Sequence, residues 1–427
     1  MSQAQPSVEW FELPAGPWPW LLPLLVGTGT VALLLRVGLW WLSLRLVARA
    51  PRACGRGLAI TVLKPLRGLD EGLEHNLASL LLQDHDGPLQ FVFGVTTADD
   101  PALAVVRRLQ QRFPAREIAV VVGRGDAAHN PKVANLLGML PHARHDVLLI
   151  SDSNVCVAAD YLRRIADDLA PEVALVANPV IGLRAQTLGA ACENLQLGGV
   201  ITGAVAAGAW LGHPCVIGKS MLVRRHALAT LGGLQRFGDV LAEDYAIGQA
   251  MVRARLRVVT SPYVVATHVG AWTVGRFAAR HLRWCQMRRW IAPWAYLGEP
   301  LLLPSCWWLA VAWLCLGAGG GAGWSMLAVA GVLAACGVEA ACGRVLRGGW
   351  QLREAAVTPY KDAIMLGLWA LAWVRRDVAW RGHHYRIGPG SVLTPVGARP
   401  VPLPCDRASE PLAPLSAAAG SIGGAAR

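Results

Sequence analysis

The sequence contains little lysine and no pair of cysteines spaced for metal binding. Only four of its 40 basic residues are lysines, and the others are arginines, a bias that is typical of a GC-rich bacterial genome. None of the ten cysteines forms a C-x-x-C pair. The sequence therefore indicates neither a zinc site nor a disulfide framework, and we expect the cysteines to be reduced, packed thiols.

Features of nucleic-acid-binding proteins are also missing. The formal net charge is +12, but basic and aromatic residues are not interleaved and no nucleic-acid-binding motif is present. We therefore expect no nucleic-acid partner. Anionic lipid headgroups account better for the basic excess, because arginines beside apolar segments bind such headgroups.

Apolar residues are present in excess. They make up 54% of the chain, and the mean hydropathy of +0.39 is higher than soluble globular proteins usually show. Residues 17–47 form a first run that is long enough to cross a bilayer. Because Glu9 and Glu12 stand where a signal peptide is positively charged, we interpret this run as a transmembrane helix. Arginines follow it, so the positive-inside rule places residues 1–16 outside the cytoplasm and the following chain inside.

The carboxyl-terminal third contains further apolar runs. Residues 300–343 predict a transmembrane hairpin. Residues 360–386 contain a short apolar run, 363–374, with arginines after it, which predicts an interfacial or re-entrant helix. Residues 400–427 are rich in Pro, Ala, Ser and Gly and are expected to be disordered. We predict an integral membrane protein of the bacterial inner membrane, with a cytoplasmic domain at 58–290.

The region 58–290 alternates short β-rich runs with helical stretches. This alternation predicts an α/β domain built on a mostly parallel sheet. The small, apolar run 195–211 is too short and too rich in glycine to span a bilayer, so it is either a buried helix or an element at the membrane surface. The expected strands are 59–63, 90–95, 118–122, 147–150, 174–177 and 258–260, and the expected helices include 71–82, 103–111 and 161–169.

Two aspartate motifs follow predicted strands. Asp99-Asp100-Pro101 comes after the strand at 90–95, and Asp152-Ser153-Asn154 comes after the strand at 147–150. Nucleotide ribose and metal ions are usually bound at the carboxyl ends of strands in open α/β sheets. These aspartates are therefore candidate ligands for a nucleotide and a metal ion.

A third acidic motif precedes an arginine cluster. Glu243 and Asp244 are adjacent, and Arg280-His-Leu-Arg283-Trp284 begins 36 residues after Asp244. A carboxylate can accept a proton from an attacking hydroxyl, and paired arginines can hold a phosphate-bearing leaving group. In this order the motifs indicate sugar transfer from a nucleotide sugar.

The order of the motifs resembles that of the ceramide glucosyltransferase-like membrane glycosyltransferases, family 21, and among them the bacterial hopanoid-associated members. That family is described by three aspartate motifs followed by (Gln/Arg)-x-x-Arg-Trp. The resemblance covers about residues 58–290 and implies a GT-A type, Rossmann-like glycosyltransferase domain with N- and C-terminal transmembrane helices. It further implies inverting transfer of a hexose or N-acetylhexosamine from a UDP-sugar to the hydroxyl of a ceramide-like or hopanoid lipid. The matching residues are Asp100, Asp152, Asp244 and Arg280-x-x-Arg283-Trp284, with flanking agreement at 63–68, 130–135 and 218–220.

The resemblance assigns a role to each aspartate, and each has a plainer alternative. Asp244 would be the general base, or a carboxylate at a helix N-terminus. Asp152 would hold Mg²⁺ or Mn²⁺ beside the diphosphate, or cap the turn after a strand. Asp100 would contact the uridine, or cap a helix that begins near Pro101. Lys64 and Lys132 are expected to line the nucleotide pocket.

The arginine cluster has a similar alternative. On a helix, Arg280, Arg283 and Trp284 share one face and can address one ligand. A basic cluster at the lipid interface is the plainer interpretation. A second match, Gln286-Met-Arg-Arg289-Trp290, overlaps this region, and we expect the first match to be catalytic because its offset from Asp244 suits the family.

Two other functions remain open on the sequence. A processive polysaccharide synthase shares the same motifs but needs more membrane helices for an export channel. A non-catalytic membrane scaffold would not need intact carboxylates at all three positions. His268, His281 and the pair His383–His384 have spacings that predict structural or interfacial roles rather than a metal site.

Overall fold

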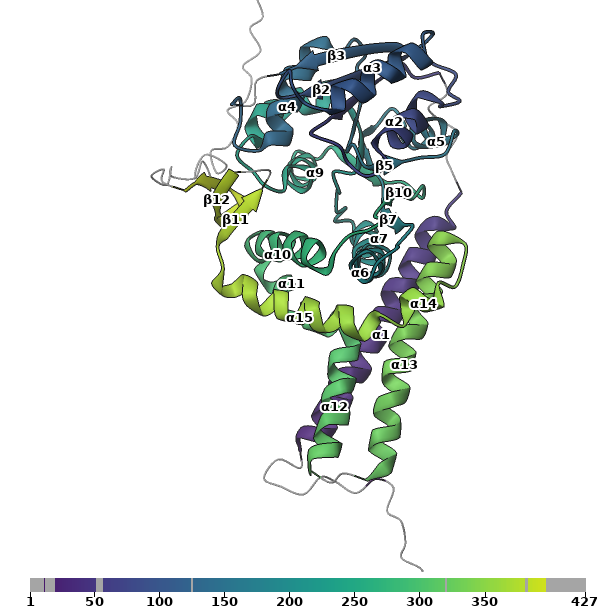
Figure 1. Ribbon diagram of the computed structural model, residues 1–427, viewed down its shortest axis with the longest axis vertical. Coiled ribbons are helices and arrows are strands. Elements are labelled where there is room, and N and C mark those ends of the chain that lie inside the picture. Colours follow the sequence, from purple (N-terminus) through teal and green to yellow (C-terminus); the bar gives the residue numbers. More distant parts are fainter. Residues whose placement is uncertain are drawn as a thin grey trace, which may run out of the picture.

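The computed structural model describes residue 11 and residues 20–50, 57–123, 126–318, 321–380 and 383–396. The predicted disordered tail, 400–427, and most of the segment 1–16 lie outside the described residues. Figure 1 shows an α/β domain at one end of the molecule, with α1 (Leu21–Val47), α12 (Pro304–Ala318) and α13 (Ala322–Arg347) extending away from it. Between the domain and these helices, α10 (Val274–Ile291) and α15 (Thr358–Val374) run across the helix direction.

The domain is built on a seven-stranded sheet of mixed direction. The four consecutive strands β3, β2, β1 and β4 run parallel to one another, whereas β8 is antiparallel to both of its neighbours, β4 and β6. All six predicted strands are confirmed, and β8 is the one that the sequence analysis did not predict. In sheet order the strands are β3 (Glu117–Val122), β2 (Leu89–Val95), β1 (Ile60–Pro65), β4 (Val147–Ser151), β8 (Ser220–Arg224), β6 (Val173–Ala177) and β9 (Arg257–Thr260).

Helices cover both faces of this sheet, which is why every residue of β1 is buried. One core cluster joins the sheet to α2 (Leu73–Leu81), α3 (Ala102–Arg112) and α5 (Tyr161–Asp168). The other joins it to α4 (Pro131–Met139), α8 (Arg225–Thr230) and α9 (Glu243–Arg253). The predicted α/β architecture is confirmed.

Two small sheets extend the domain. In the first, β10 (Val265–His268) lies between β5 (Val155–Cys156) and β7 (Val180–Leu183). The second contains β11 (Asp377–Trp380), β12 (His383–Ile387) and β13 (Leu393–Pro395). The hydroxyl of Tyr385 donates to the carbonyl of His129 over 2.8 Å, so this C-terminal sheet is attached to the α/β domain. The short 3₁₀ helices are η1 (Leu140–His142), η3 (Leu234–Phe237), η4 (Glu299–Leu302) and η5 (Pro389–Ser391).

The run 195–211 continues α6 (Leu188–Leu195) as a π-helical segment, Gln196–Ile201, and then as α7 (Thr202–Trp210). Most of its residues are buried, as the buried-helix interpretation expects. A Cβ added at Gly203 would lie 2.8 Å from the Cβ of Leu39. The glycine therefore allows α7 to approach the long amino-terminal helix closely.

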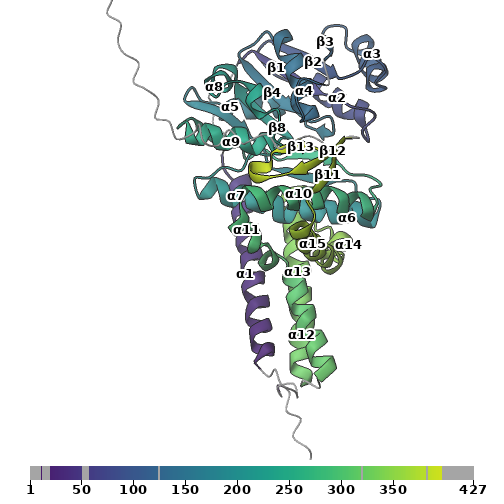
Figure 2. The ribbon, with the colours of Figure 1, turned by 90° about the vertical axis from the view of Figure 1, so that its left-hand side faces the viewer.

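Three apolar helices form the extended part of the molecule (Figure 2). α1 (Leu21–Val47) and α13 (Ala322–Arg347) are long and apolar enough to cross a membrane, and α12 (Pro304–Ala318) contains a shorter apolar stretch. The predicted helix at 363–374 is the end of a longer helix, α15 (Thr358–Val374). The remaining helices of this region are α10 (Val274–Ile291), α11 (Pro293–Leu297) and α14 (Leu352–Ala355).

Buried charges connect these helices. Arg36 of α1 forms an ion pair with Glu339 of α13, and both side chains are nearly inaccessible to solvent. Lys361 of α15 lies 3.7 Å from the same glutamate and 2.7 Å from Asp362. A buried charge is costly unless it is paired, so this cluster specifies how α1, α13 and α15 associate.

Candidate functional site

One pocket, of about 640 Å³, brings together residues from distant parts of the sequence. It lies between the carboxyl end of β4, the start of α9, and helices α10 and α11. Its wall is charged near the sheet. Near α11 it combines the apolar side chains of Ile291, Ala292 and Ala295 with the ion pair of Arg288 and Glu299. All of the predicted site residues except Lys64 and Asp100 line it, namely Lys132, Asp152, Asp244, Arg280, Arg283 and Trp284.

Asp152 lies directly after β4 and is held between two lysines. Nζ of Lys132 is 2.9 Å from one carboxylate oxygen, and Nζ of Lys219 is 3.0 Å from the other. Burial alone would raise the pKa of Asp152, but the two ammonium groups lower it below its ordinary value. Asp152 is therefore ionised at neutral pH and is paired with two ammonium groups.

Lys132 is shared between two carboxylates. It follows the helix-capping residue Asn130 at the start of α4, and its Nζ is also 3.0 Å from the buried carboxylate of Glu243. Burial would lower the pKa of Lys132, but Asp152 and Glu243 raise it above its ordinary value. Lys132 is therefore charged, and it links Asp152, the candidate metal ligand, to Glu243.

Lys64 lies behind the wall of the pocket rather than on it. Its side chain is completely buried at the end of β1, and its Nζ donates to the hydroxyl of Ser151 and to the carbonyl of Asp152. Burial lowers the pKa of Lys64 to about 7. This corrects the expectation that Lys64 lines the pocket: the residue supports the backbone that presents Asp152.

Asp100 also lies outside this pocket and binds backbone groups. Its carboxylate accepts hydrogen bonds from the N–H groups of Gly68, at 3.0 Å, and Ala102, at 2.9 Å. The hydrogen bond from Ala102, at the start of α3, is the one expected if Asp100 caps that helix, which was the alternative role of this residue. The loops after β1 and β2 are thereby joined at the carboxyl edge of the parallel strands, and contact between Asp100 and a uridine stays a prediction.

Asp244 lies in the first turn of α9 and points into the pocket. Its carboxylate accepts hydrogen bonds from the backbone N–H groups of Gly218 and Tyr245. Burial, and then the negative charge of Glu243, raise the pKa of Asp244 to about 7. A carboxylate with a pKa near neutrality is suited to accept a proton and later release it. A Cβ at Gly218 would lie 2.8 Å from the carboxylate, so only glycine permits this approach.

Arg280 is held in place by a glutamate that the sequence analysis did not identify. Glu193 of α6 is fully buried and lies 3.1 Å from Nη1 of Arg280 and 2.7 Å from Nε2 of His281. Burial would raise the pKa of Glu193, but Arg280 and His281 lower it to about 2. The guanidinium of Arg280 also lies 4.4 Å from the centre of the Trp284 ring. These contacts orient the pocket-facing side of α10.

The two arginine-tryptophan motifs have different surroundings. Arg283 and Trp284 line the pocket, whereas Arg289 and Trp290 do not. Arg289 donates to the carbonyl oxygens of Ala372 and Trp373 at the end of α15, each over 2.6 Å. The geometry therefore favours the first motif as the ligand-binding one.

Three functional candidates were missed by the sequence analysis. Lys219, Glu193 and Trp272 all contribute to the pocket or to its support. Lys219 had a usable signal, because it is one of only four lysines and lies in the flanking run Gly218-Lys-Ser220. Glu193 had none, because its partners, Arg280 and His281, lie 87 and 88 residues further along the chain.

The donor set near Asp152 is compatible with a divalent cation. Mg²⁺ and Mn²⁺ prefer oxygen ligands. Two such oxygens share a contact with Lys219, whose Nζ lies 3.0 Å from the carboxylate of Asp152 and 2.7 Å from the side-chain oxygen of Asn154. The two lysine ammonium groups already place positive charge against these oxygens.

Comparison with known proteins agrees with this geometry. The model of glycosyl transferase family 21 matches residues 25–393. The chain belongs to glycosyltransferase family 21. Ceramide glucosyltransferase 1 of Caenorhabditis elegans is 30% identical over 245 residues, which are 57% of this chain and 52% of that protein. Ceramide glucosyltransferase 3 of the same organism is 27% identical over 57% of this chain and 53% of that protein. The chain thus spans about half the length of these curated relatives.

Among solved structures, the chain is similar to the mannosyltransferase PcManGT from Pyrobaculum calidifontis, solved in complex with GDP-Man and Mn²⁺. The identity is 19%, the match covers 83% of this chain and 99% of that one, and the TM-score is 0.46.

Proposed function

We propose that this family 21 protein transfers a hexose or N-acetylhexosamine from a UDP-sugar to the hydroxyl of a membrane lipid, with inversion at the anomeric carbon. The observation that carries the proposal is the course of the pocket. It begins at the carboxylates of Asp152 and Asp244 and reaches the apolar side chains of Ile291, Ala292 and Ala295, in the segment that leads through η4 to α12. A charged donor and an apolar acceptor can therefore meet in one cavity.

In the proposed reaction Asp244 accepts the proton of the lipid hydroxyl as its oxygen attacks the anomeric carbon. The bond between that carbon and the β-phosphate oxygen of UDP breaks at the same time. Arg280 and Arg283 stabilise the negative charge that develops on the diphosphate. Lys132 and Lys219 contribute further positive charge at the opposite wall.

We propose that Asp152, with Asn154, holds the divalent cation of the reaction. When bound there, Mg²⁺ or Mn²⁺ neutralises charge on the leaving diphosphate. Asp152→Ala is expected to lower transfer as strongly as a chelator does, whereas the wild-type chain in metal-free buffer should recover on addition of either ion. Full activity without metal would mean that the two lysines alone neutralise the diphosphate.

We propose that α1, α12 and α13 cross the inner membrane, that α15 lies at its cytoplasmic surface, and that residues 58–290 are cytoplasmic. The apolar helices and the arginines after residue 35 support this arrangement. A reporter fused after residue 427 should be cytoplasmic. A cysteine engineered between α12 and α13 should be labelled only from the opposite side.

The experiment that tests the function uses the purified chain in lipid vesicles. UDP-glucose or UDP-N-acetylglucosamine is supplied with vesicles that contain either ceramide or a hydroxylated hopanoid, and lipid products are measured by mass spectrometry. We expect a product with one added sugar and stoichiometric UDP. A ladder of products would indicate the processive synthase, and no UDP release with any pair would indicate the non-catalytic scaffold.

A further inference from the structure

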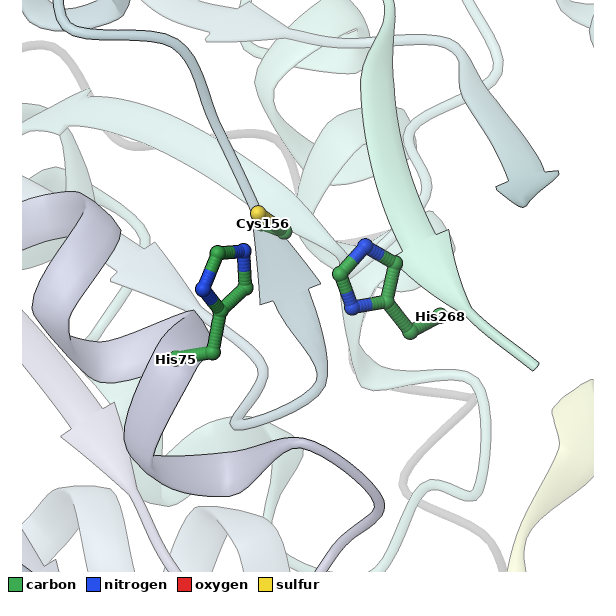
Figure 3. A group of neighbouring side chains, drawn as sticks. All are labelled: His75, Cys156 and His268. Carbon is green, nitrogen blue, oxygen red and sulfur yellow. The ribbon is translucent and has the colours of Figure 1, made fainter. Parts of the chain in front are cut away.

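Three potential metal ligands lie together on the side of the α/β domain, outside the pocket described above. They are His75 of α2, Cys156 of β5 and His268 of β10. One ligand atom from each lies within 4.8 Å of the others, and Figure 3 shows the three side chains facing a common space. The large separations between them in the sequence explain why the sequence analysis expected His268 to belong to no metal site.

The fold brings the three residues together through two contacts. β5 and β10 pair antiparallel with Cys156 opposite Ala266, and His268, two residues further along β10, therefore lies on the same face of this sheet. α2 packs beside β5, where the hydroxyl of Ser79 accepts from the N–H of Val157 at 3.2 Å. The rings of His75 and His268 stack with their centres 5.5 Å apart.

We propose that His75, Cys156 and His268 bind one Zn²⁺ ion. Two imidazole nitrogens and a thiolate are a typical three-residue zinc set, and the fourth position would be taken by solvent. Mg²⁺ and Mn²⁺ prefer oxygen ligands, so this site selects a different metal from the one proposed at Asp152. Bond lengths of about 2.0–2.3 Å place tetrahedral ligand atoms about 3.5 Å apart. The ligand atoms, which lie within 4.8 Å of one another, must therefore move closer, and His75 is the exposed side chain that can rotate to do so.

The surroundings favour binding. Within the described ranges, none of the three side chains makes a hydrogen bond or ion pair that metal binding would have to break. A second pocket, of about 490 Å³, is lined by His75 and Cys156 and gives an ion access from solvent.

Metal binding at His75, Cys156 and His268 would also affect the pocket around Asp152 and Asp244. Each ligand lies close in sequence to a residue that lines that pocket: His75 to Asp70, Cys156 to Asp152, and His268 to Trp272. A bound ion would therefore fix three segments that carry pocket residues. The ligands would act as positioning residues rather than as catalytic ones.

Cobalt substitution tests the site on the full chain in detergent. After treatment with chelator, titration with Co²⁺ should produce a thiolate-to-cobalt charge-transfer absorption at one ion per chain, and Zn²⁺ should abolish it. Cys156→Ser should remove this absorption, and His268→Gln should weaken Zn²⁺ binding at least about tenfold. The matched controls Cys336→Ser and His226→Ala should bind as the wild type does. An unchanged absorption in Cys156→Ser would overturn the proposal.

A measurement on the wild-type chain avoids variants that fail to fold. Zn²⁺ at one equivalent should slow alkylation of Cys156 at least about tenfold, as read by peptide mass spectrometry, because a coordinated thiolate is withdrawn from reaction. Alkylation of Cys336 on the same chain is the internal control. If Zn²⁺ leaves the rate at Cys156 unchanged, the site does not exist.

Discussion

The two arginine-tryptophan motifs of α10 contain the same residue types but have different surroundings. Arg283 and Trp284 line the pocket that contains Asp244. Arg289 binds the last carbonyl oxygens of α15, and Trp290 packs against the cluster formed by the C-terminal sheet. Six residues separate the two copies, which places them about 120° apart around a helix of 3.6 residues per turn. The surroundings of each copy therefore predict its role.

The largest effect should come from the carboxylate that the first motif faces. Asp244→Asn keeps the shape and an acceptor oxygen for Gly218 but removes the proton acceptor, so transfer should fall by about 10³-fold while UDP-sugar binding persists. The measurement is labelled lipid formed per minute in vesicles. Asp239→Asn, a change at an exposed carboxylate near the start of α9, is the control and should retain activity. Retention of a tenth of wild-type turnover in Asp244→Asn would refute the role of Asp244.

The acidity of Asp244 predicts a pH profile. Its pKa is raised to about 7, so below pH 7 the base becomes protonated and kcat/KM should fall about tenfold per pH unit. Above pH 7 the carboxylate is ionised, and its contribution should reach a plateau. The profile is measured with the donor subsaturating. A flat profile through two units below neutrality would show that another group accepts the proton.

Substitution of Trp284 should mainly affect acceptor binding or turnover, whereas substitution of Trp290 should mainly affect stability. Trp284→Ala removes an aromatic wall of the pocket and should change acceptor KM or kcat by about tenfold, the value of roughly 1.4 kcal/mol of lost contact. Trp290→Ala should leave KM unchanged and lower the melting temperature, because its ring packs against the C-terminal-sheet cluster and does not line the pocket. Equal effects on KM from the two changes would remove the distinction between the motifs.

The smallest effect on the rate should come from Arg289→Ala. Loss of the two hydrogen bonds to the end of α15 should destabilise the fold by about 1–3 kcal/mol and change kcat by less than about twofold. Thermal unfolding in detergent and turnover at low temperature measure these two quantities separately. A large loss of turnover with an unchanged melting temperature would assign Arg289 to the active site.

Much of the fold could be predicted because apolar runs identify buried strands and helices. The strands β1 to β4, β6 and β9 all follow this pattern. β8 was missed because only Met221, Leu222 and Val223 separate Ser220 from Arg224, which is too short a signal. The start of α15 was missed because Lys361 and Asp362 look like a charged, exposed flank in the sequence. In the fold both side chains are buried, and Glu339 lies close to them.

Some residues of the site could likewise be predicted from the sequence, and others could not. Asp152, Asp244 and the arginine motif could be predicted because their order along the chain is itself a signal. The support of Arg280 by Glu193, and the approach of His75 to His268, depend on contacts between distant segments and have no local pattern. The choice between the two arginine motifs needed the rotation of α10 relative to Asp244, which spacing alone does not give.

Arg283→Lys and Arg289→Lys, assayed in the same vesicles with the same donor and lipid, compare the two motifs directly. Both changes keep the charge and replace a planar, two-point phosphate donor with a compact one. We predict that Arg283→Lys lowers labelled-lipid formation by about 100-fold, and that Arg289→Lys stays within about threefold of the wild type. An inactive Arg289→Lys beside an active Arg283→Lys would contradict the account and place the ligand-binding face of α10 on its other side.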